Sequence, residues 1–309
     1  LSPVRENLLE WYEWNPSGRL LQIGADYGAL TGMLSEKLKE VTVWDLRDEA
    51  LEVVRRRYPE AENIRLIKRS FLEELEESSF DYIWIPEFRR DLMPERGEQG
   101  IKALLTGLKK YLKPGGTLLA AGFNRIGLRI FAGAEPDPET EPVTLRLIRE
   151  ISQECLDGAF TKIYYPTPDH RLPTTLYSDK RLPEKGELPN LSMVYDQPGY
   201  RYFNEEAGFD QLLQEDQFPQ FADSYLMIWR NSSDGKEFDK NLANQTCFVK
   251  YNRNRKEEFQ IRTSIIEENG VRWVEKTALT DRASEHIRLL KEKKKQIKEC
   301  YKNIRAVQV

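Results

Sequence analysis

The 309-residue chain contains few cysteines and histidines, and this scarcity excludes several kinds of chemistry. Its three cysteines, Cys155, Cys247 and Cys300, are scattered and show no CxxC spacing. That pattern argues against a disulfide framework or a zinc site and favours a reducing, cytoplasmic location. The two histidines, His170 and His286, nearly exclude a histidine metal cluster or a Ser-His-Asp triad. We therefore expect no metal.

Long apolar runs and a strong bias of charge are also missing. No stretch approaches the roughly 20 apolar residues that a membrane-spanning helix needs, and no charged start followed by an apolar run indicates a signal peptide. The net charge of -4 argues against a dedicated nucleic-acid binder. The chain starts at Leu1 without a methionine, which suggests a piece of a longer protein. We expect neither a membrane span nor a nucleic-acid partner.

Apolar runs instead alternate with amphipathic helical patterns. This alternation predicts a parallel sheet covered by helices on both faces, an α/β, Rossmann-like fold. Helices are expected at 29–38, 48–58, 99–112 and 143–156. Seven strands are expected at 19–23, 40–46, 64–67, 80–85, 117–121, 160–165 and 222–230.

Two segments depart from this rhythm. Residues 166–221 hold many prolines and aromatics without sustained periodicity, and an insertion of that length before the last strand is typical of an ordered lid. A polar stretch at 231–241 then precedes three short apolar runs and a charged helical pattern. We predict a main domain over 1–232 with its lid at 166–221. A small C-terminal α+β unit of three strands and a helix follows over 243–309 and could be truncated.

A glycine turn follows the first strand, and an acid ends the second. The turn reads Gly24-Ala25-Asp26-Tyr27-Gly28, and the acid is Asp45. The spacing is not GxGxxG, and an aspartate facing a pyrophosphate would repel it. The GK[ST] ending of a phosphate-binding P-loop is absent as well. A ligand with an amine, a sulfonium and hydroxyls for Asp45 tolerates this turn better.

Together with FDYIWIP at 80–86 and LKPGG at 112–116, these residues resemble the class I S-adenosylmethionine-dependent methyltransferases over about residues 1–232. The resemblance implies S-adenosyl-L-methionine as cofactor, with the glycine loop under its methionine part and Asp45 at its ribose hydroxyls. It also implies that residues after the third strand neighbour the adenine and that the end of the fourth strand faces the reacting methyl group. The implied cofactor-binding residues are Ile23, Gly24, Ala25, Asp26, Gly28, Asp45, Leu46, Ser70, Phe71 and Pro86.

A narrower resemblance rests on LSPVRENLLEW at 1–11, FNRIGLRIFAGA at 123–134 and YYPTPDHRLPTTLYSD at 164–179. These stretches are similar to methyltransferase modules encoded with bacterial surface-polysaccharide glycosyltransferases, which are often one domain of a longer chain. The resemblance implies a bacterial enzyme of polysaccharide biosynthesis. Its methyl acceptor would be a hydroxyl of a glycan, a nucleotide sugar or a related small molecule, and its partners would be other domains of a longer chain or a glycosyltransferase.

Candidate catalytic residues follow the fourth and fifth strands. Glu87 ends the fourth strand and is the most natural general base for a sugar hydroxyl, although a solvated loop glutamate is an alternative interpretation. Asn124 and Arg125 could orient the acceptor, Arg125 through its planar guanidinium, or could be an ordinary surface pair. Four residues that open the insertion could contact the substrate or could simply pack the loop down: Tyr164, Tyr165, Asp169 and His170.

Two functions stay open because the glycine loop is unusual. Gln22 stands where the resembled class usually carries an acid, and Asp26 replaces the middle glycine of its loop. Aspartate adopts left-handed backbone more readily than most residues, so the turn itself can form. Methyl transfer mainly requires alignment and exclusion of water, so few histidines are no obstacle. The chain is therefore either an active methyltransferase or a weakened, methyltransferase-like scaffold that organises a glycan-assembly partner.

Overall fold

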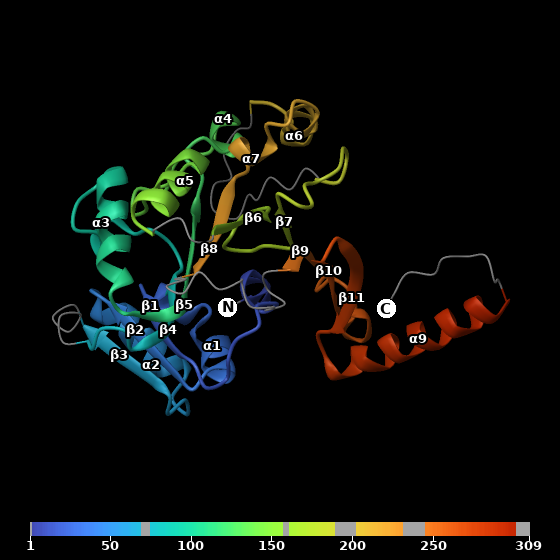
Figure 1. Ribbon diagram of the computed structural model, residues 1–309, viewed down its shortest axis with the longest axis horizontal. Coiled ribbons are helices and arrows are strands. Elements are labelled where there is room, and N and C mark those ends of the chain that lie inside the picture. Colours follow the sequence, from blue (N-terminus) through green and yellow to red (C-terminus); the bar gives the residue numbers. More distant parts are fainter. Residues whose placement is uncertain (1, 69–74, 157–160, 189–201, 231–244, 301–309) are drawn as a thin grey trace.

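The computed structural model describes residues 2–68, 75–156, 161–188, 202–230 and 245–300, with side chains described as far as residue 296. Within them, eleven strands form one continuous mixed sheet (Figure 1). The strands lie in the order β11-β10-β9-β7-β6-β8-β5-β4-β1-β2-β3. The α/β, Rossmann-like fold predicted from the alternating pattern is confirmed, but the sheet is larger than the predicted seven strands.

One half of the sheet is parallel and consists of the first five strands. These are β1 (Arg19–Ile23), β2 (Glu40–Asp45), β3 (Ile64–Lys68), β4 (Phe80–Ile85) and β5 (Leu112–Phe123). Because β1 pairs with β2 on one side and with β4 on the other, the strand order reverses at β1. Open α/β sheets bind their ligands at such a switch point, outside the carboxyl ends of the strands.

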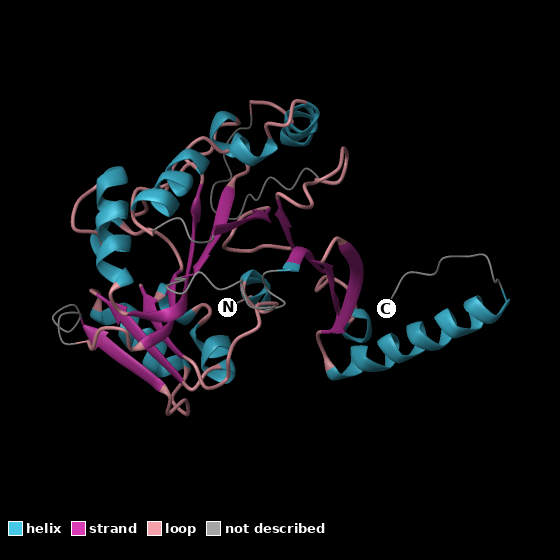
Figure 2. Ribbon diagram, viewed as in Figure 1, coloured by secondary structure: helices cyan, strands magenta, loops and turns pink. Residues whose placement is uncertain are grey.

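Helices cover both faces of this parallel half, as Figure 2 shows. The 3-10 helix η1 (Pro3–Leu8) and helices α1 (Thr31–Lys37) and α2 (Asp48–Arg57) contribute to one apolar core, and α3 (Gly97–Lys109) and α5 (Leu145–Glu154) to the other. Neighbouring side chains of β1 alternate between the two cores. The three apolar residues of this strand, Leu20, Leu21 and Ile23, are fully buried because helices cover both faces of the sheet.

The other half of the sheet is antiparallel and starts at β8 (Ser224–Arg230), which pairs with β5 over seven residues. Next to it lies β6 (Thr161–Thr167), followed by β7 (Thr175–Ser178). Strand β7 lies inside the segment predicted as a lid, so part of that segment belongs to the sheet. The same segment supplies α6 (Glu205–Gln214) and α7 (Phe218–Phe221), which lie with α4 (Leu128–Phe131) at the top of the view in Figure 1.

The C-terminal strands extend this same sheet. They are β9 (Thr246–Tyr251), β10 (Ile261–Glu268) and β11 (Val271–Ala278), and helix α9 (Asp281–Cys300) follows them. Strand β9 joins β7 through only two residue pairs, Thr175 with Lys250 and Leu176 with Val249. These three strands, together with β7, account for the difference between eleven and seven. A domain boundary at 243 stays a prediction.

The N-terminal helix η1 links the parallel half to the C-terminal strands. The Asn7 side-chain amide donates to the Pro173 carbonyl oxygen at 2.8 Å, and its Oδ1 accepts from Arg253 at 2.6 Å. Just beyond the helix, Glu10 accepts hydrogen bonds from Tyr251 and Arg262, both at 3.0 Å. Helix α9 packs against β11 and projects from the body (Figure 1). No helix in the described ranges is long and apolar enough to cross a membrane.

Candidate functional site

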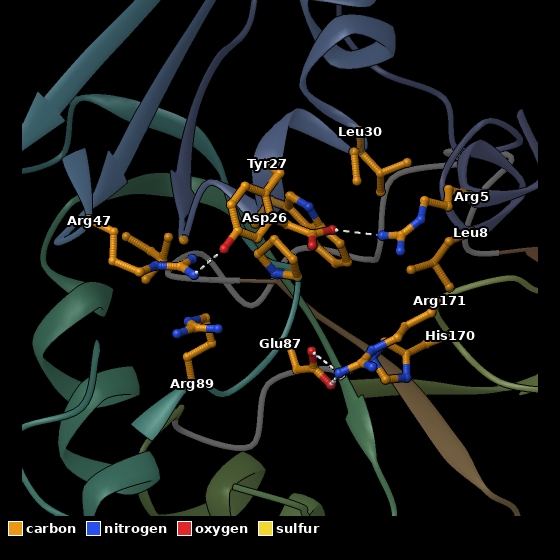
Figure 3. Close-up of a pocket in the computed structure, with 15 residues that line it drawn as sticks. Arg5, Leu8, Asp26, Tyr27, Leu30, Arg47, Glu87, Arg89, His170 and Arg171 are labelled. Carbon is orange, nitrogen blue, oxygen red and sulfur yellow. Dashed lines mark hydrogen bonds and ion pairs between the residues drawn. The ribbon is translucent and has the colours of Figure 1, made fainter. Parts of the chain in front are cut away.

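A pocket opens at the switch point, where the loops after β1, β2 and β4 meet helix η1 and the start of the insertion (Figure 3). It encloses about 600 Å³ of space that is open to solvent. We call it the switch-point pocket. Its lining consists of Arg5, Leu8, Ile23, Gly24, Asp26, Tyr27, Ala29, Leu30, Arg47, Trp84, Pro86, Glu87, Arg89, His170 and Arg171.

The glycine loop forms one wall of this pocket through a run of left-handed backbone. Gly24 and Gly28 have φ values of 89° and 80°, and Asp26 and Tyr27 have values of 42° and 48°. The positive φ of Gly28 favours glycine there, and a Cβ at this position would also crowd the Tyr58 ring at 3.0 Å. Asp26 adopts the left-handed conformation that aspartate tolerates better than most residues.

The side chain of Gln22 stabilises this loop through hydrogen bonds to its backbone. Its side-chain amide is buried and donates to the carbonyl oxygens of Gly24 at 2.8 Å and Ala25 at 3.1 Å. Its oxygen accepts a hydrogen bond from the Thr31 hydroxyl at 3.0 Å. Because two carbonyl oxygens point at position 22, a donor is needed there, and an ionised acid could not supply one. The departure at Gln22 therefore matches the local shape of the loop.

Asp26 points into the pocket and is paired with the N-terminal helix. Its Oδ2 lies 3.4 Å from Arg5 Nη1 (Figure 3). Burial in the pocket raises the pKa of Asp26, and the nearby Arg5 guanidinium opposes that rise. The negative charge that the sequence places in this loop is therefore partly neutralised by Arg5.

Asp45 lies at the end of β2 with its carboxylate fully buried. Oδ1 accepts from the backbone N–H of Arg47 at 2.9 Å and from Arg47 Nε at 3.2 Å. Oδ2 accepts from the Ala25 N–H at 2.8 Å and from Arg47 Nη2 at 3.1 Å. Burial alone would raise the pKa of Asp45, but the bonds from Arg47 and Ala25 outweigh it and lower the pKa.

Glu87 and His170 meet on the opposite wall. Arg171 Nη2 donates to both oxygens of Glu87, at 3.0 and 2.9 Å, and His170 Nε2 lies 3.5 Å from Glu87 Oε1 (Figure 3). Burial would raise the pKa of Glu87, but His170 and Arg171 together lower it. His170 is only 3% exposed, and neither of its ring nitrogens has a hydrogen-bond partner among the described residues.

A second cavity of about 750 Å³ shares Arg171 with the switch-point pocket. We call it the side cavity. The Phe123 ring forms part of its wall, with the Arg171 guanidinium carbon 4.8 Å from the ring centroid and the His170 ring 4.6 Å away between centroids. Arg171 Nη2 also donates to Asp137 at 2.7 Å. The charged residues around the side cavity are Arg125, Arg129, Glu135, Asp137 and Arg171.

The structure brings together most of the residues predicted around the glycine loop. The pocket is lined by Ile23, Gly24, Asp26, Pro86, Glu87 and His170. Ala25 and Asp45 support it through their mutual hydrogen bond, and Leu46 lines a wider, solvent-open neighbouring cavity beside α3. Ser70 and Phe71 lie outside the described residues.

Five other predicted residues lie outside the lining of the switch-point pocket, although two of them, Asn124 and Arg125, line the side cavity. Asn124 is buried, and its amide donates to the carbonyl oxygens of residues 220 and 222 at 2.8 Å each. Arg125 forms an ion pair with Glu98 at 2.7 Å. Tyr164 and Tyr165 are fully buried, and Asp169 Oδ1 accepts two backbone N–H bonds in its own turn. The Pro-rich start of the insertion is therefore packed down, except at His170 and Arg171, which line the pocket.

Sequence reasoning missed the arginines of the pocket. Arg5, Arg47, Arg89 and Arg171 line it, each within hydrogen-bonding distance of an acid. Arg47 could have been suspected, because it follows the strand-ending acid by two residues. Arg5 and Arg171 come from distant segments, and no local pattern marks them. Within the described ranges, no group of three or more His, Cys, Asp or Glu side chains could hold a metal ion.

One family model matches part of the chain. Residues 20–116 match a model described as a methyltransferase domain. This match spans the glycine loop, Asp45 and Glu87. That part of the chain is therefore similar to a methyltransferase domain.

Two solved structures with a similar fold are described as methyltransferases. One is a SAM-dependent methyltransferase from Archaeoglobus fulgidus, with 16% identity and a TM-score of 0.47 over 74% of this chain and 92% of that chain. Another is phosphoethanolamine N-methyltransferase 2 from Haemonchus contortus in complex with S-adenosyl-L-methionine. It has 15% identity and a TM-score of 0.48, and the match covers 74% of this chain and 52% of that chain. No match was found among proteins of curated function.

Proposed function

We propose that this chain is an S-adenosylmethionine-dependent O-methyltransferase that acts on a hydroxyl of a carbohydrate or nucleotide-sugar-related acceptor in surface glycan synthesis. The observation that carries the proposal is His170. It is buried, and among the described residues neither ring nitrogen makes a hydrogen bond, although Nε2 lies 3.5 Å from Glu87 Oε1. It faces the glycine loop across the switch-point pocket. A buried imidazole without a partner is costly unless a ligand supplies one.

The pocket fits the methionine part of the cofactor. Gly24 presents no side chain to it, so a ligand can approach the backbone closely. When bound, S-adenosyl-L-methionine supplies a methyl group on a positively charged sulfur. Asp26 carries a carboxylate on the pocket wall that suits an ammonium or a sulfonium, and Asp45 lies at the end of β2, where hydroxyls would bind.

His170 is the proposed general base, and Glu87 is its positioning residue. Sequence reasoning favoured Glu87 as the base. With Arg171 on both of its oxygens and a lowered pKa, Glu87 is a weak proton acceptor. At 3.5 Å from Nε2 it can instead orient the imidazole and stabilise the imidazolium that forms when His170 takes the proton of the hydroxyl. Such a base contributes about 10²–10⁴-fold to the rate.

The side cavity is the proposed acceptor site. It adjoins His170 through Phe123 and Arg171, and it combines carboxylates with guanidinium groups. Carboxylates accept hydrogen bonds from hydroxyls and guanidinium groups donate to oxygens, so the mixture suits a ligand with many hydroxyls. A partner glycosyltransferase or further domains of a longer chain belong to the same proposal. So does a cytoplasmic location, which the free thiols of Cys155 and Cys247 fit.

The test compares His170→Gln with His286→Gln, the same substitution at the other histidine, which lies on helix α9. Transfer of a labelled methyl group is measured on a panel of nucleotide sugars and bacterial surface oligosaccharides, alongside calorimetric binding of S-adenosylhomocysteine. We expect His170→Gln to lower kcat by about 10²–10⁴-fold with binding unchanged, and His286→Gln to change neither.

Three outcomes would count against this assignment. Full activity in His170→Gln would exclude His170 as the general base. Methylation of non-carbohydrate acceptors alone would exclude the proposed class of acceptor. No binding of S-adenosylhomocysteine up to millimolar concentration would favour the alternative, a methyltransferase-like scaffold that organises a glycan-assembly partner.

A further inference from the structure

The hydrogen bonds of Asp45 leave no room for a ribose. An ionised carboxylate offers about four acceptor positions, two on each oxygen. In Asp45 all four are used: two by the backbone N–H groups of Ala25 and Arg47, and two by the Arg47 guanidinium. The backbone bonds fix the carboxylate at the end of β2. The guanidinium holds the remaining two positions, one on each oxygen.

These two positions are the ones that a ribose would need. A vicinal diol has two adjacent hydroxyl donors and binds a carboxylate with one hydrogen bond to each oxygen, as the guanidinium does through Nε at 3.2 Å and Nη2 at 3.1 Å. Both ligands cannot bind the same face of Asp45. We propose that Arg47 competes with the cofactor for Asp45, so that binding of the ribose requires the guanidinium to move away.

The surroundings of Arg47 provide a place for it to go. Its side chain lines the switch-point pocket, with Nη1 3.3 Å from the Tyr27 hydroxyl and the guanidinium carbon 5.2 Å from the Tyr27 ring centroid (Figure 3). Asp91 Oδ2 lies 3.9 Å from Nε, on the side of the neighbouring cavity. A small rotation exchanges Asp45 for Asp91 as the anionic partner, and Tyr27 can follow because it is 48% exposed.

This inference rests on the proposed function, and it predicts an unusual result. A pocket-lining arginine would normally be expected to help binding. Here the bound conformation is available only in the fraction of molecules whose Arg47 has left Asp45, and the apparent Kd increases by the inverse of that fraction. If the Asp45-bound arrangement is favoured tenfold, removing the side chain tightens binding about tenfold.

The experiment is calorimetric titration of S-adenosylhomocysteine into the full chain and its variants. Arg47→Ala is expected to bind about tenfold more tightly than the unsubstituted chain. Arg47→Lys loses the bidentate contact with Asp45, so its affinity should lie between those two values. Arg90→Ala is the control, since it removes the same charge from an ion pair with Glu141 outside the pocket lining. Asp45→Asn should weaken binding with or without Arg47.

A second pair of ligands tests whether the competition is for the diol. Adenosine should gain affinity from Arg47→Ala, whereas 2′,3′-dideoxyadenosine, which lacks both hydroxyls, should gain none. Weaker binding of S-adenosylhomocysteine to Arg47→Ala overturns the inference while leaving the proposed function intact. An equal gain for both nucleosides also overturns it. No binding by either the unsubstituted chain or Arg47→Ala overturns the inference and the proposed cofactor site together.

Discussion

The identity of residue 22 gives the sharpest test of how the glycine loop is held. Restoring the acid usual in the resembled class, Gln22→Glu, keeps the size of the side chain and its bond from Thr31. It replaces the amide donor, however, with an oxygen that faces the Gly24 and Ala25 carbonyls at hydrogen-bonding distance. We therefore expect this apparently restoring substitution to destabilise the protein.

The magnitude follows from the bonds that are lost. The Ala25 carbonyl keeps the hydrogen bond from the Gly28 N–H at 2.8 Å. The Gly24 carbonyl loses its donor, and an unsatisfied buried acceptor costs about 1–3 kcal/mol. A buried carboxylate facing two carbonyls adds to that cost, so we expect a loss of about 3 kcal/mol at pH 8. In a chain of this size, each kcal/mol lowers Tm by about 2 °C.

The dependence on pH separates this mechanism from a simple packing defect. Burial next to carbonyl oxygens raises the pKa of the new glutamate in the folded state. Its cost is therefore small below the unfolded pKa of about 4.3 and grows as the pH rises through that value to the folded pKa. The control Gln22→Met loses the same donors without adding a charge, so its cost should not change with pH.

The assay is urea unfolding of the three proteins at pH 4.5 and pH 8, followed by tryptophan fluorescence. When the pH is raised from 4.5 to 8, the free energy of unfolding of Gln22→Glu should fall relative to that of Gln22→Met. Equal stability of Gln22→Glu and the unsubstituted chain at pH 8, within about 0.5 kcal/mol, would show that the Gly24 and Ala25 carbonyls do not require a donor. The account of the loop given above would then be wrong.

Three further changes test other parts of the structure. Burial raises the pKa of Asp223 to about 7, from about 3.9 in an unfolded chain. The free energy of unfolding should therefore fall as the pH rises from about 4 to 7. In urea titrations, Asp223→Asn should reduce that fall by about 1.4 kcal/mol per unit of pKa shift. An unchanged dependence of the unfolding free energy on pH would show that Asp223 is not protonated in the folded protein. Gly28→Ala should cost about 1–2 kcal/mol in thermal unfolding, because its φ of 80° disfavours a side chain, and an unchanged Tm would contradict this. Tyr164→Phe removes the hydroxyl that donates to the Thr246 carbonyl and should cost about 1 kcal/mol without changing S-adenosylhomocysteine affinity. Weaker binding would indicate that Tyr164 contributes to the site.

The parallel half of the fold could be predicted from the sequence because its signals are local. The run at 19–23 and the turn that follows it are contiguous, and burial on both faces makes most residues of the central strands apolar. The expected first strand coincides with β1. The antiparallel extension was harder to predict, since β7 has only four residues and lies inside a Pro-rich segment. No local pattern indicates that it bridges β6 and β9.

The candidate site likewise combines residues with a local sequence signal and residues without one. Residues near the ends of the strands, such as Gly24, Asp45 and Glu87, could be placed from sequence because a switch point collects the ends of neighbouring strands. The partners of these residues could not. Arg171 reaches Glu87 across 84 positions of sequence, and only the folded chain shows that the two lie side by side. The 3.5 Å contact between His170 and Glu87 likewise appears only in the folded chain.

The position of helix η1 has a mechanical consequence. Arg5 and Leu8 line the switch-point pocket, while Asn7 and nearby Glu10 bind the insertion and the C-terminal strands. One short helix therefore touches the pocket with some residues and the far part of the sheet with others. A displacement of β9 or β10 would therefore act on the segment around helix η1, and through that segment on the Arg5–Asp26 contact at the glycine loop.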